Sequence, residues 1–306
     1  MNKSCLIGFL MCSAFSLVVQ AATDGAHITK TISQIERKKG IKRTIQYRPD
    51  GNDFVCVNGK NRYTRALYGG ITDFRIETSD RPVFAAYKPK DSKHICFRLQ
   101  CGNQSIALDS LKFCEARYRA GRRTYRLTDP LLGKGELNIS VLAFPDAEGG
   151  IWRFTMKDMP EGALLHCYIS EIRAKNLSRN GDMGADRADS FDAPQLPKEQ
   201  KHYKLSLDGT TAYIVVEDQE LRLPALVEGT SLYDKSEKWR SEIESSLQIS
   251  TPDPYFNPLG GALAAAADGI WDGKIWLHGA IGWRSQLNGW RAAYIGDFIG
   301  WHDRAR

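Results

Sequence analysis

Short strand-like runs, separated by turn signals rather than by helical patterns, constrain the fold of this chain more than any other feature. From about residue 30 to residue 230, runs rich in β-branched and aromatic side chains alternate with Gly, Pro, Asn and Asp. The predicted strands are 44–47, 54–57, 106–111, 124–127, 137–144, 151–157, 164–169, 203–207 and 212–216. Within 151–157, Trp152, Phe154 and Met156 share one face, which is typical of a half-buried strand. The series predicts a mainly β protein built on an antiparallel β-sandwich.

The first 21 residues predict a cleaved signal peptide rather than a part of the fold. Met1-Asn2-Lys3 is a short positive start, residues 5–19 are apolar, and Val19-Gln20-Ala21 fits the small-residue rule for cleavage before Ala22. The apolar run is too short, and its flanks are wrong, for a membrane-spanning helix. We therefore expect an exported protein, periplasmic or extracellular, without a membrane span.

Five cysteines remain after the predicted cleavage: Cys56, Cys96, Cys101, Cys114 and Cys167. Their spacing does not match a zinc site. We predict that they are small buried side chains on strands. Because export permits disulfides, a Cys96–Cys101 or Cys101–Cys114 bridge is the alternative.

The formal net charge is +6, and basic residues cluster at 37–43 and 117–126. A solvated strand face explains such clusters in most proteins. The functional alternative is a surface for an acidic glycan, since an exported protein rarely meets nucleic acid. The sequence lacks the motifs of serine hydrolases, phosphate loops, dinucleotide-binding folds and zinc proteases, and we predict no nucleic-acid partner and no cofactor.

A long polar segment at about 175–200 interrupts the predicted strands. Asp182, Asp186 and Asp189 in this segment could supply oxygen ligands to calcium. Their spacing differs from the calcium helix–loop–helix pattern, so we favour a turn-rich loop without a metal.

Helical patterns begin near residue 234. Asp234 is a suitable N-cap, and Trp239, Ile243 and Leu247 follow as an apolar stripe. Asn257-Pro258 predicts the start of a second helix. The predicted division is a signal peptide at 1–21, a β-sandwich domain at 22–233, a linker helix and extended linker at 234–256, and a helical segment at 257–306.

Tryptophan is concentrated in that last segment, which holds five of the seven in the chain. If the segment is helical throughout, seven residues spaced 4, 3, 4, 3, 4 and 3 apart share one stripe. These residues are Trp283, Leu287, Trp290, Tyr294, Asp297, Trp301 and Arg304. Such a stripe is most often core, and Gly296-Asp297 could instead break the helix, with Asp297 capping a new turn.

The polar run Trp301-His302-Asp303-Arg304 favours a functional site over a plain core. A carboxylate among aromatic rings is partly desolvated, which raises its pKa and suits a general acid. Aromatic faces can also stack on sugar rings, and Arg or His can bind hydroxyl groups or a uronate carboxylate.

Several motifs along the chain resemble one family. They are Tyr-Thr-Arg-Ala-Leu-Tyr-Gly at 63–69, Asp-Pro-Leu-Leu-Gly-Lys-Gly at 129–135, Gly-Asp-Met-Gly-Ala-Asp at 181–186, Leu-Gly-Gly-Ala-Leu at 259–263, Trp-Leu-His-Gly-Ala at 276–280, Gly-Trp-Arg at 282–284, Leu-Asn-Gly-Trp-Arg at 287–291, Gly-Asp at 296–297 and Gly-Trp-His-Asp-Arg-Ala-Arg at 300–306. Together they resemble exported proteins of bacterial polysaccharide-utilisation systems that look like six-hairpin glycosidases. The resemblance covers nearly all of the chain after the signal peptide.

This resemblance implies an N-terminal β-sandwich, a linker helix and an (α/α)6 barrel. In such proteins the Trp-His-Asp-Arg segment lies early in the barrel. We therefore expect this chain to hold only the first barrel helices, as the front part of a longer enzyme, and to be inactive alone.

The implied function is that of a glycoside hydrolase-like protein acting on a polysaccharide or oligosaccharide, with an acidic glycan as one candidate. The resemblance and the composition of the segment 257–306 together assign a sugar subsite to these residues: Trp283, Arg284, Trp290, Arg291, Trp301, His302 and Arg304. Asp297 or Asp303 is the local acid/base candidate. The alternatives are a non-catalytic carbohydrate-binding β-sandwich protein and an inactive gene fragment.

Overall fold

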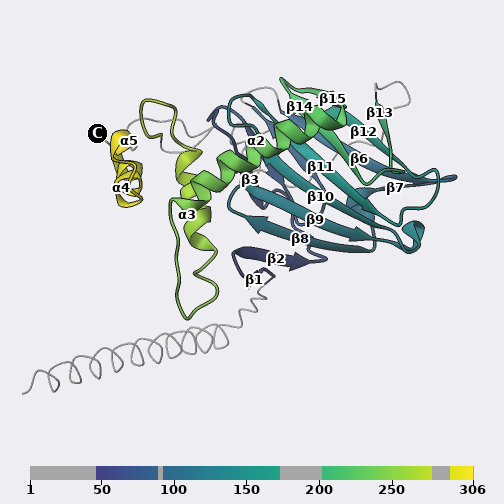
Figure 1. The fold of residues 1–306 in the computed structure, drawn as a ribbon, viewed down its shortest axis with the longest axis horizontal. Helices are drawn as coiled ribbons and strands as arrows, with labels where there is room; N and C mark the ends of the chain where they lie inside the picture. The colour runs from purple at the N-terminus through teal and green to yellow at the C-terminus, as the bar shows by residue number, and fades with distance from the viewer. Residues whose placement is uncertain (1–45, 89–91, 173–201, 278–289, 306) are drawn as a thin grey trace, which may run out of the picture. The chain divides into compact units, whose positions relative to one another are not determined.

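The structure is a computed structural model that describes residues 46–88, 92–172, 202–277 and 290–305. Strands predominate, and they form two antiparallel sheets (Figure 1). The first, eight-stranded sheet has the order β1 (Arg48–Asp50), β2 (Asp53–Val57), β8 (Phe113–Arg119), β9 (Arg122–Thr128), β10 (Glu136–Ala143), β11 (Gly149–Lys157), β14 (Thr211–Glu217) and β15 (Glu220–Arg222).

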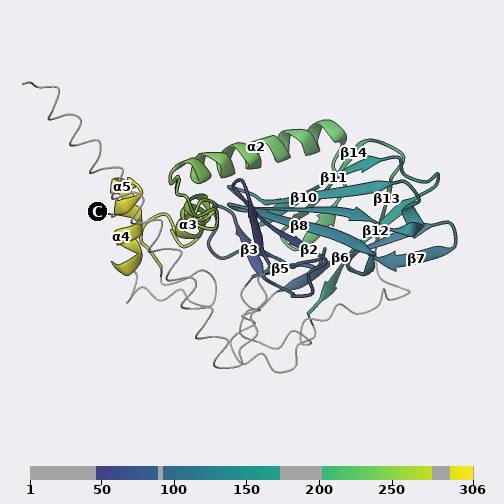
Figure 2. The same cartoon turned by 90° about the horizontal axis from the view of Figure 1, so that it is seen from below.

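The second, seven-stranded sheet has the order β13 (Tyr203–Ser206), β12 (Leu164–Glu171), β6 (Lys93–Cys101), β5 (Phe84–Tyr87), β4 (Arg75–Thr78) and β3 (Arg65–Tyr68), and β7 (Gln104–Ala107) pairs with β6. Two 3-10 turns, η1 (Leu108–Ser110) and η2 (Pro130–Leu132), connect strands. The two sheets lie face to face as the layers of a sandwich (Figure 2).

The core lies between the sheets, and β11 shows how the sequence creates it. Trp152, Phe154 and Met156 are buried, as their alternation predicts, while the residues between them face outward. The Trp152 ring meets the Phe84 ring of the opposite sheet edge to face, with centroids 5.7 Å apart. The predicted antiparallel β-sandwich is therefore present.

Two predicted strands differ from the structure. The described residues of 44–47 are not in a strand, and β1 follows at Arg48–Asp50, because the turn forms at Gly51 with a φ of +58°. The predicted strand 106–111 ends at Ala107, and the 3-10 turn η1 begins at Leu108.

The five cysteines after the predicted signal peptide are free thiols on strands, and neither alternative disulfide forms. Cys56, Cys96, Cys114 and Cys167 are buried, and Cys101 is half-buried. Burial raises the pKa of the Cys96 and Cys114 thiols to about 12. These side chains pack as small apolar groups, as predicted.

Helix α2 (Leu226–Ser245) lies across part of the outer face of the eight-stranded sheet (Figure 2). It begins eight residues before the predicted N-cap Asp234, which is an exposed residue inside the helix. Its buried residues are Gly229, Tyr233, Ser236 and Arg240. The predicted apolar stripe Trp239, Ile243 and Leu247 is only half-buried, so the sheet is contacted mainly by a different face of the helix.

Candidate functional site

The helical segment after the sandwich consists of α3 (Leu259–Asp268), α4 (Trp290–Phe298) and α5 (His302–Ala305) (Figure 1). Helix α3 begins directly after Asn257-Pro258, as predicted, but Pro258 occupies the N-cap position, and the Asn257 side chain accepts the Thr251 N–H rather than capping the helix. A tight turn follows α3, in which the Asp272 carboxylate accepts the backbone N–H groups of Lys274 and Ile275 at 2.9 and 2.8 Å. The turn brings Trp271 and Trp276 together as an antiparallel β-bridge.

A glycine separates α4 from α5. Gly300 has a φ of +86°, a conformation that glycine adopts without strain. Its N–H donates to the carbonyl of Asp297 at 3.1 Å, and the N–H of Trp301 donates to the carbonyl of Gly296 at 2.8 Å. This is the Schellman pattern of a helix C-terminus. The helix break therefore occurs, but at Gly300 rather than at Gly296-Asp297, and a helical stripe cannot continue from Asp297 to Trp301.

Trp301 belongs to a layer of tryptophans inside the helical segment. The rings of Trp276 and Trp301 are nearly parallel, with 8° between their planes and 6.3 Å between centroids. Trp271 packs on Trp276 with centroids 5.1 Å apart. Gly296 allows α4 to approach, because a Cβ atom there would lie only 2.4 Å from the Trp276 ring. Trp301 thus has the packing role that an aromatic stripe usually has.

Arg304 ties this tryptophan layer to α3. Its Nη1 donates to Asp268 Oδ1 at 2.6 Å, and its guanidinium lies 4.4 Å from the centroid of the Trp301 ring. Its backbone carbonyl accepts the Trp276 Nε1–H at 2.8 Å. Both the side chain and the backbone of Arg304 therefore have internal partners.

Asp268 is the desolvated carboxyl group of this segment, and sequence reasoning did not select it. Its side chain is 7% exposed. Burial raises the pKa of Asp268, although the charge and hydrogen bond of Arg304 oppose the shift. Asp268 and Arg304 lie 36 positions apart in the sequence, so no local pattern links them.

The predicted residues Asp297 and His302 meet across the helix break. Oδ1 of Asp297 lies 2.7 Å from Nδ1 of His302, and both side chains are exposed. When His302 donates its Nδ1–H to Asp297, its Nε2 is left as a hydrogen-bond acceptor. Asp303, the other predicted carboxylate, is exposed in the first turn of α5. Both carboxylates thus lie in water rather than among the tryptophan rings.

Exposed aromatic side chains accompany the Asp297–His302 pair on α4. Tyr294 is 68% exposed and Phe298 is 80% exposed. They stand four residues apart, so they share one face of the helix, and Asp297 lies on the adjoining part of that face. This surface offers aromatic rings beside a hydrogen-bonding pair.

The other predicted site residues are less fully described. Trp290 and Arg291 form the first positions of α4. Trp283 and Arg284 lie outside the described residues, as do Asp182, Asp186 and Asp189 and the basic cluster 37–43. Over the ranges that the structure does describe, no group of three or more His, Cys, Asp or Glu side chains is arranged to hold a metal ion.

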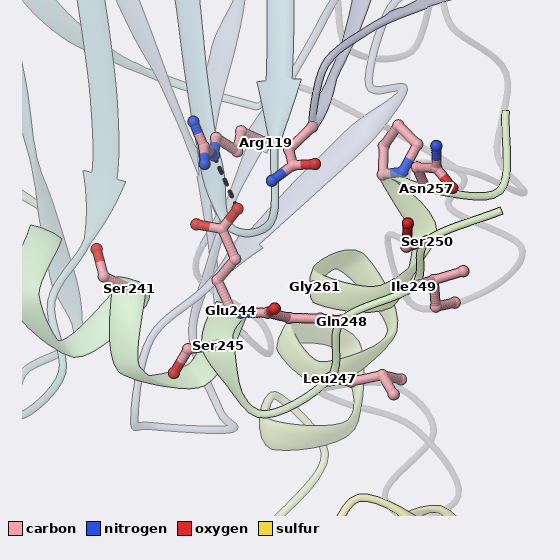
Figure 3. Close-up of a pocket in the computed structure, with 12 residues that line it drawn as sticks. Arg119, Ser241, Glu244, Ser245, Leu247, Gln248, Ile249, Ser250, Asn257 and Gly261 are labelled. Carbon is pink, nitrogen blue, oxygen red and sulfur yellow. Dashed lines mark hydrogen bonds and ion pairs between the residues drawn. The ribbon is translucent and has the colours of Figure 1, made fainter. Parts of the chain in front are cut away.

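A cavity of about 550 Å³ lies where the sandwich meets the C-terminal end of α2, the following linker and the start of α3 (Figure 3). Arg119 of β8 and Glu244 of α2 point toward each other in it, with Arg119 Nε 2.7 Å from Glu244 Oε1 (Figure 3). Most of the other lining residues are hydroxyl or amide side chains: Asn52, Ser241, Ser245, Gln248, Ser250 and Asn257. The cavity can hydrogen-bond a polar ligand, but no aromatic ring lines it.

The Arg119–Glu244 pair belongs to a larger set of ion pairs, the α2 ion-pair network, formed by Arg119, Glu244, Arg240, Glu237 and Arg122. Arg240 is almost fully buried, and its Nη1 and Nη2 lie 2.7 and 2.8 Å from Glu244 and Glu237. Arg122 Nη1 contacts Glu237 at 2.8 Å. The network fixes α2 to strands β8 and β9.

The helices of the described ranges include none that is both long and apolar enough to cross a membrane. Residues 89–217 are similar to a protein family described as a domain of unknown function (DUF4450). The matched region ends with β14 and includes β6 to β14, which is most of the sandwich core. A comparison with curated proteins finds no match.

Proposed function

We propose that this chain belongs to an exported glycoside hydrolase-like protein, in which the sandwich precedes the first helices of an (α/α)6 barrel. The proposal has two supports. The motifs at 259–263, 276–291 and 296–306 resemble six-hairpin glycosidases of polysaccharide-utilisation systems. The exposed Asp297–His302 pair, which carries the proposal, lies beside Tyr294 and Phe298 on one surface.

In this proposal α4 and α5 form part of a sugar subsite. Tyr294 and Phe298 supply apolar rings for the face of a sugar, and His302 binds a hydroxyl group through Nε2. Asp297, or Asp303, is the acid/base candidate, and Trp283, Arg284, Trp290 and Arg291 complete the subsite. Trp301, Arg304 and Asp268 hold the two helices in place. Glycosidases commonly use a pair of carboxylates, and the second would come from later barrel helices.

A second candidate function is non-catalytic carbohydrate binding by the sandwich. Two observations favour it. Asp297 and Asp303 are exposed, whereas a general acid is usually desolvated. The cavities described for this chain also involve the sandwich and α2 rather than α4 and α5.

Calorimetric titration with a panel of neutral and acidic oligosaccharides distinguishes these functions by where the ligand binds. His302→Ala and Asp297→Asn test the subsite. Asp234→Asn, an exposed acid on α2, is the matched control. Binding that is lost in both subsite variants and kept in the control supports the subsite.

Binding that is equal in all four proteins would refute the subsite and favour the second candidate. Failure of the wild-type chain to bind any oligosaccharide would refute both functions. Thermal unfolding of each variant identifies a loss that is due to misfolding.

A further inference from the structure

The outer face of the eight-stranded sheet carries a second cavity, of about 340 Å³, beside α2. Four arginines line it: Arg117 of β8, Arg122 and Arg126 of β9, and Arg153 of β11. We call it the arginine cavity. Uncharged polar side chains lie in the same cross-strand rows. Thr124, Ser140 and Arg153 are paired across β9, β10 and β11, and Arg126, Asn138 and Thr155 form the adjoining row.

Three of these arginines have carboxylate partners. Arg117 contacts Asp50 at 2.8 Å and Glu115 at 2.9 Å. Arg122 contacts Glu237 at 2.8 Å, and Arg126 lies 3.4 Å from Glu136. Their charges are therefore largely balanced within the protein.

Arg153 differs from the other three. In the part of the chain that the structure describes, no carboxylate lies within ion-pair distance of it, and its buried Nε has no hydrogen-bond partner. Its guanidinium instead stacks on the ring of Tyr233, with 3.9 Å from Cζ to the centroid. The Tyr233 hydroxyl is held 2.6 Å from Ser140 Oγ. Arg153 is thus a half-buried, oriented cation with no counter-charge among the described residues.

An oriented guanidinium is suited to binding a planar carboxylate through two hydrogen bonds. The neighbouring Thr124, Asn138 and Thr155 side chains can bind hydroxyl groups, because each can donate and accept. We propose that the arginine cavity binds a uronic acid residue of an oligosaccharide, with Arg153 on the sugar carboxylate. Glu115, which also lines the cavity, is paired with Arg117 and Arg126. The ligand carboxylate is therefore inferred from Arg153 alone, whereas its being part of a sugar rests on the proposed function.

The test uses the full chain and calorimetric titration with tetragalacturonate, its methyl ester, and the neutral maltotetraose. Wild-type protein is expected to bind tetragalacturonate and to bind the methyl ester much more weakly. Arg153→Gln should weaken tetragalacturonate binding by about tenfold or more, the effect of losing a hydrogen-bonded charge. Arg222→Gln removes an exposed arginine that is paired with Glu228 and should leave binding unchanged.

Equal binding of tetragalacturonate by Arg153→Gln and by wild type would overturn the inference. Equal wild-type affinity for tetragalacturonate and its methyl ester, or no wild-type binding of tetragalacturonate, would also overturn it. The ester comparison needs no variant, so it stands even if Arg153→Gln does not fold. His302→Ala separates the two proposals. If only His302→Ala weakens binding, the result supports the sugar subsite on α4 and α5 and refutes the inference. If only Arg153→Gln weakens binding, the result supports the inference and refutes the subsite on α4 and α5.

Discussion

Arg240→Met should destabilise the protein because Arg240 is the central member of the α2 ion-pair network. Its side chain is 5% exposed and bonds Glu237, Glu244 and the Ala120 carbonyl. Breaking a buried ion pair costs about 3–5 kcal/mol when it leaves a charge without a partner. Here Glu237 keeps Arg122 and Glu244 keeps Arg119, so we expect a smaller loss, of about 2–3 kcal/mol.

The loss should depend on pH through Glu244. Burial favours a raised pKa of Glu244, but hydrogen bonds from Arg119 and Arg240 outweigh it and hold the pKa below its usual range. The stabilisation from this lowered pKa is fully present above the unfolded value of about 4.3, and it disappears as the pH falls through the folded value. The penalty of Arg240→Met should therefore shrink in that acidic range.

Urea unfolding followed by circular dichroism measures the penalty at pH 7 and at lower pH. Lys235→Met is the matched control, because Lys235 lies on the same helix in an exposed ion pair with Asp146. Its loss should be below about 1 kcal/mol. An Arg240→Met penalty no larger than that of the control, or one that grows in acid, would refute the reasoning about the network.

Three further substitutions test other parts of the fold. Gly300→Ala should lower the free energy of unfolding in urea by about 1–2 kcal/mol, because alanine is strained at the positive φ of this residue. The control Gly209→Ala, at a position with open space and no positive φ, should lower it less. Equal losses would contradict this prediction. Trp152→Ala should cost about 3–5 kcal/mol in the same assay, and a loss below 1 kcal/mol would be inconsistent with its burial. Burial raises the pKa of Asp268. The free energy of unfolding of wild type should therefore fall relative to that of Asp268→Asn as the pH rises from about 3 through the raised pKa of Asp268. A difference between the two proteins that does not change with pH would count against this.

Alternation of buried and outward-facing residues identified some strands but not all of them: β8 (Phe113–Arg119) alternates throughout, yet it is absent from the predicted strands. β11 alternates Trp152, Phe154 and Met156 with polar residues, and its period of two identifies it. β5, with the sequence Phe-Ala-Ala-Tyr, is buried at all four positions, so it has no alternation to detect. β4 contains Arg75 and Glu77, whose mutual ion pair allows charged residues to lie in a largely buried strand.

The start and the buried face of α2 were missed for related reasons. Ala225, at the N-cap position, makes no side-chain cap, so the sequence carries no signal there. The face that meets the sheet contains Gly229, Ser236 and Arg240 beside Tyr233, so most of its buried residues are small or charged rather than apolar. Only the partners on the sheet, such as the Tyr213 ring beside Gly229, explain why these residues are buried.

The candidate site was predicted in part. The short spacing between Asp297 and His302 brings them together once the helix ends between them. The place of that end depends on which glycine adopts a positive φ, and Gly296 is instead required for contact with Trp276. The pairing of Asp268 with Arg304 is a tertiary contact that has no local pattern in the sequence.

Hydrogen exchange measured with and without a bound oligosaccharide tests the central claim, the sugar subsite on α4 and α5, most directly. The account predicts that an oligosaccharide identified by the binding panel slows amide exchange in peptides covering Trp290–Phe298 and His302–Ala305. The same experiment with His302→Ala should lose that protection. Protection confined to the strands of the sandwich, with exchange in both helices unchanged, would contradict the claim.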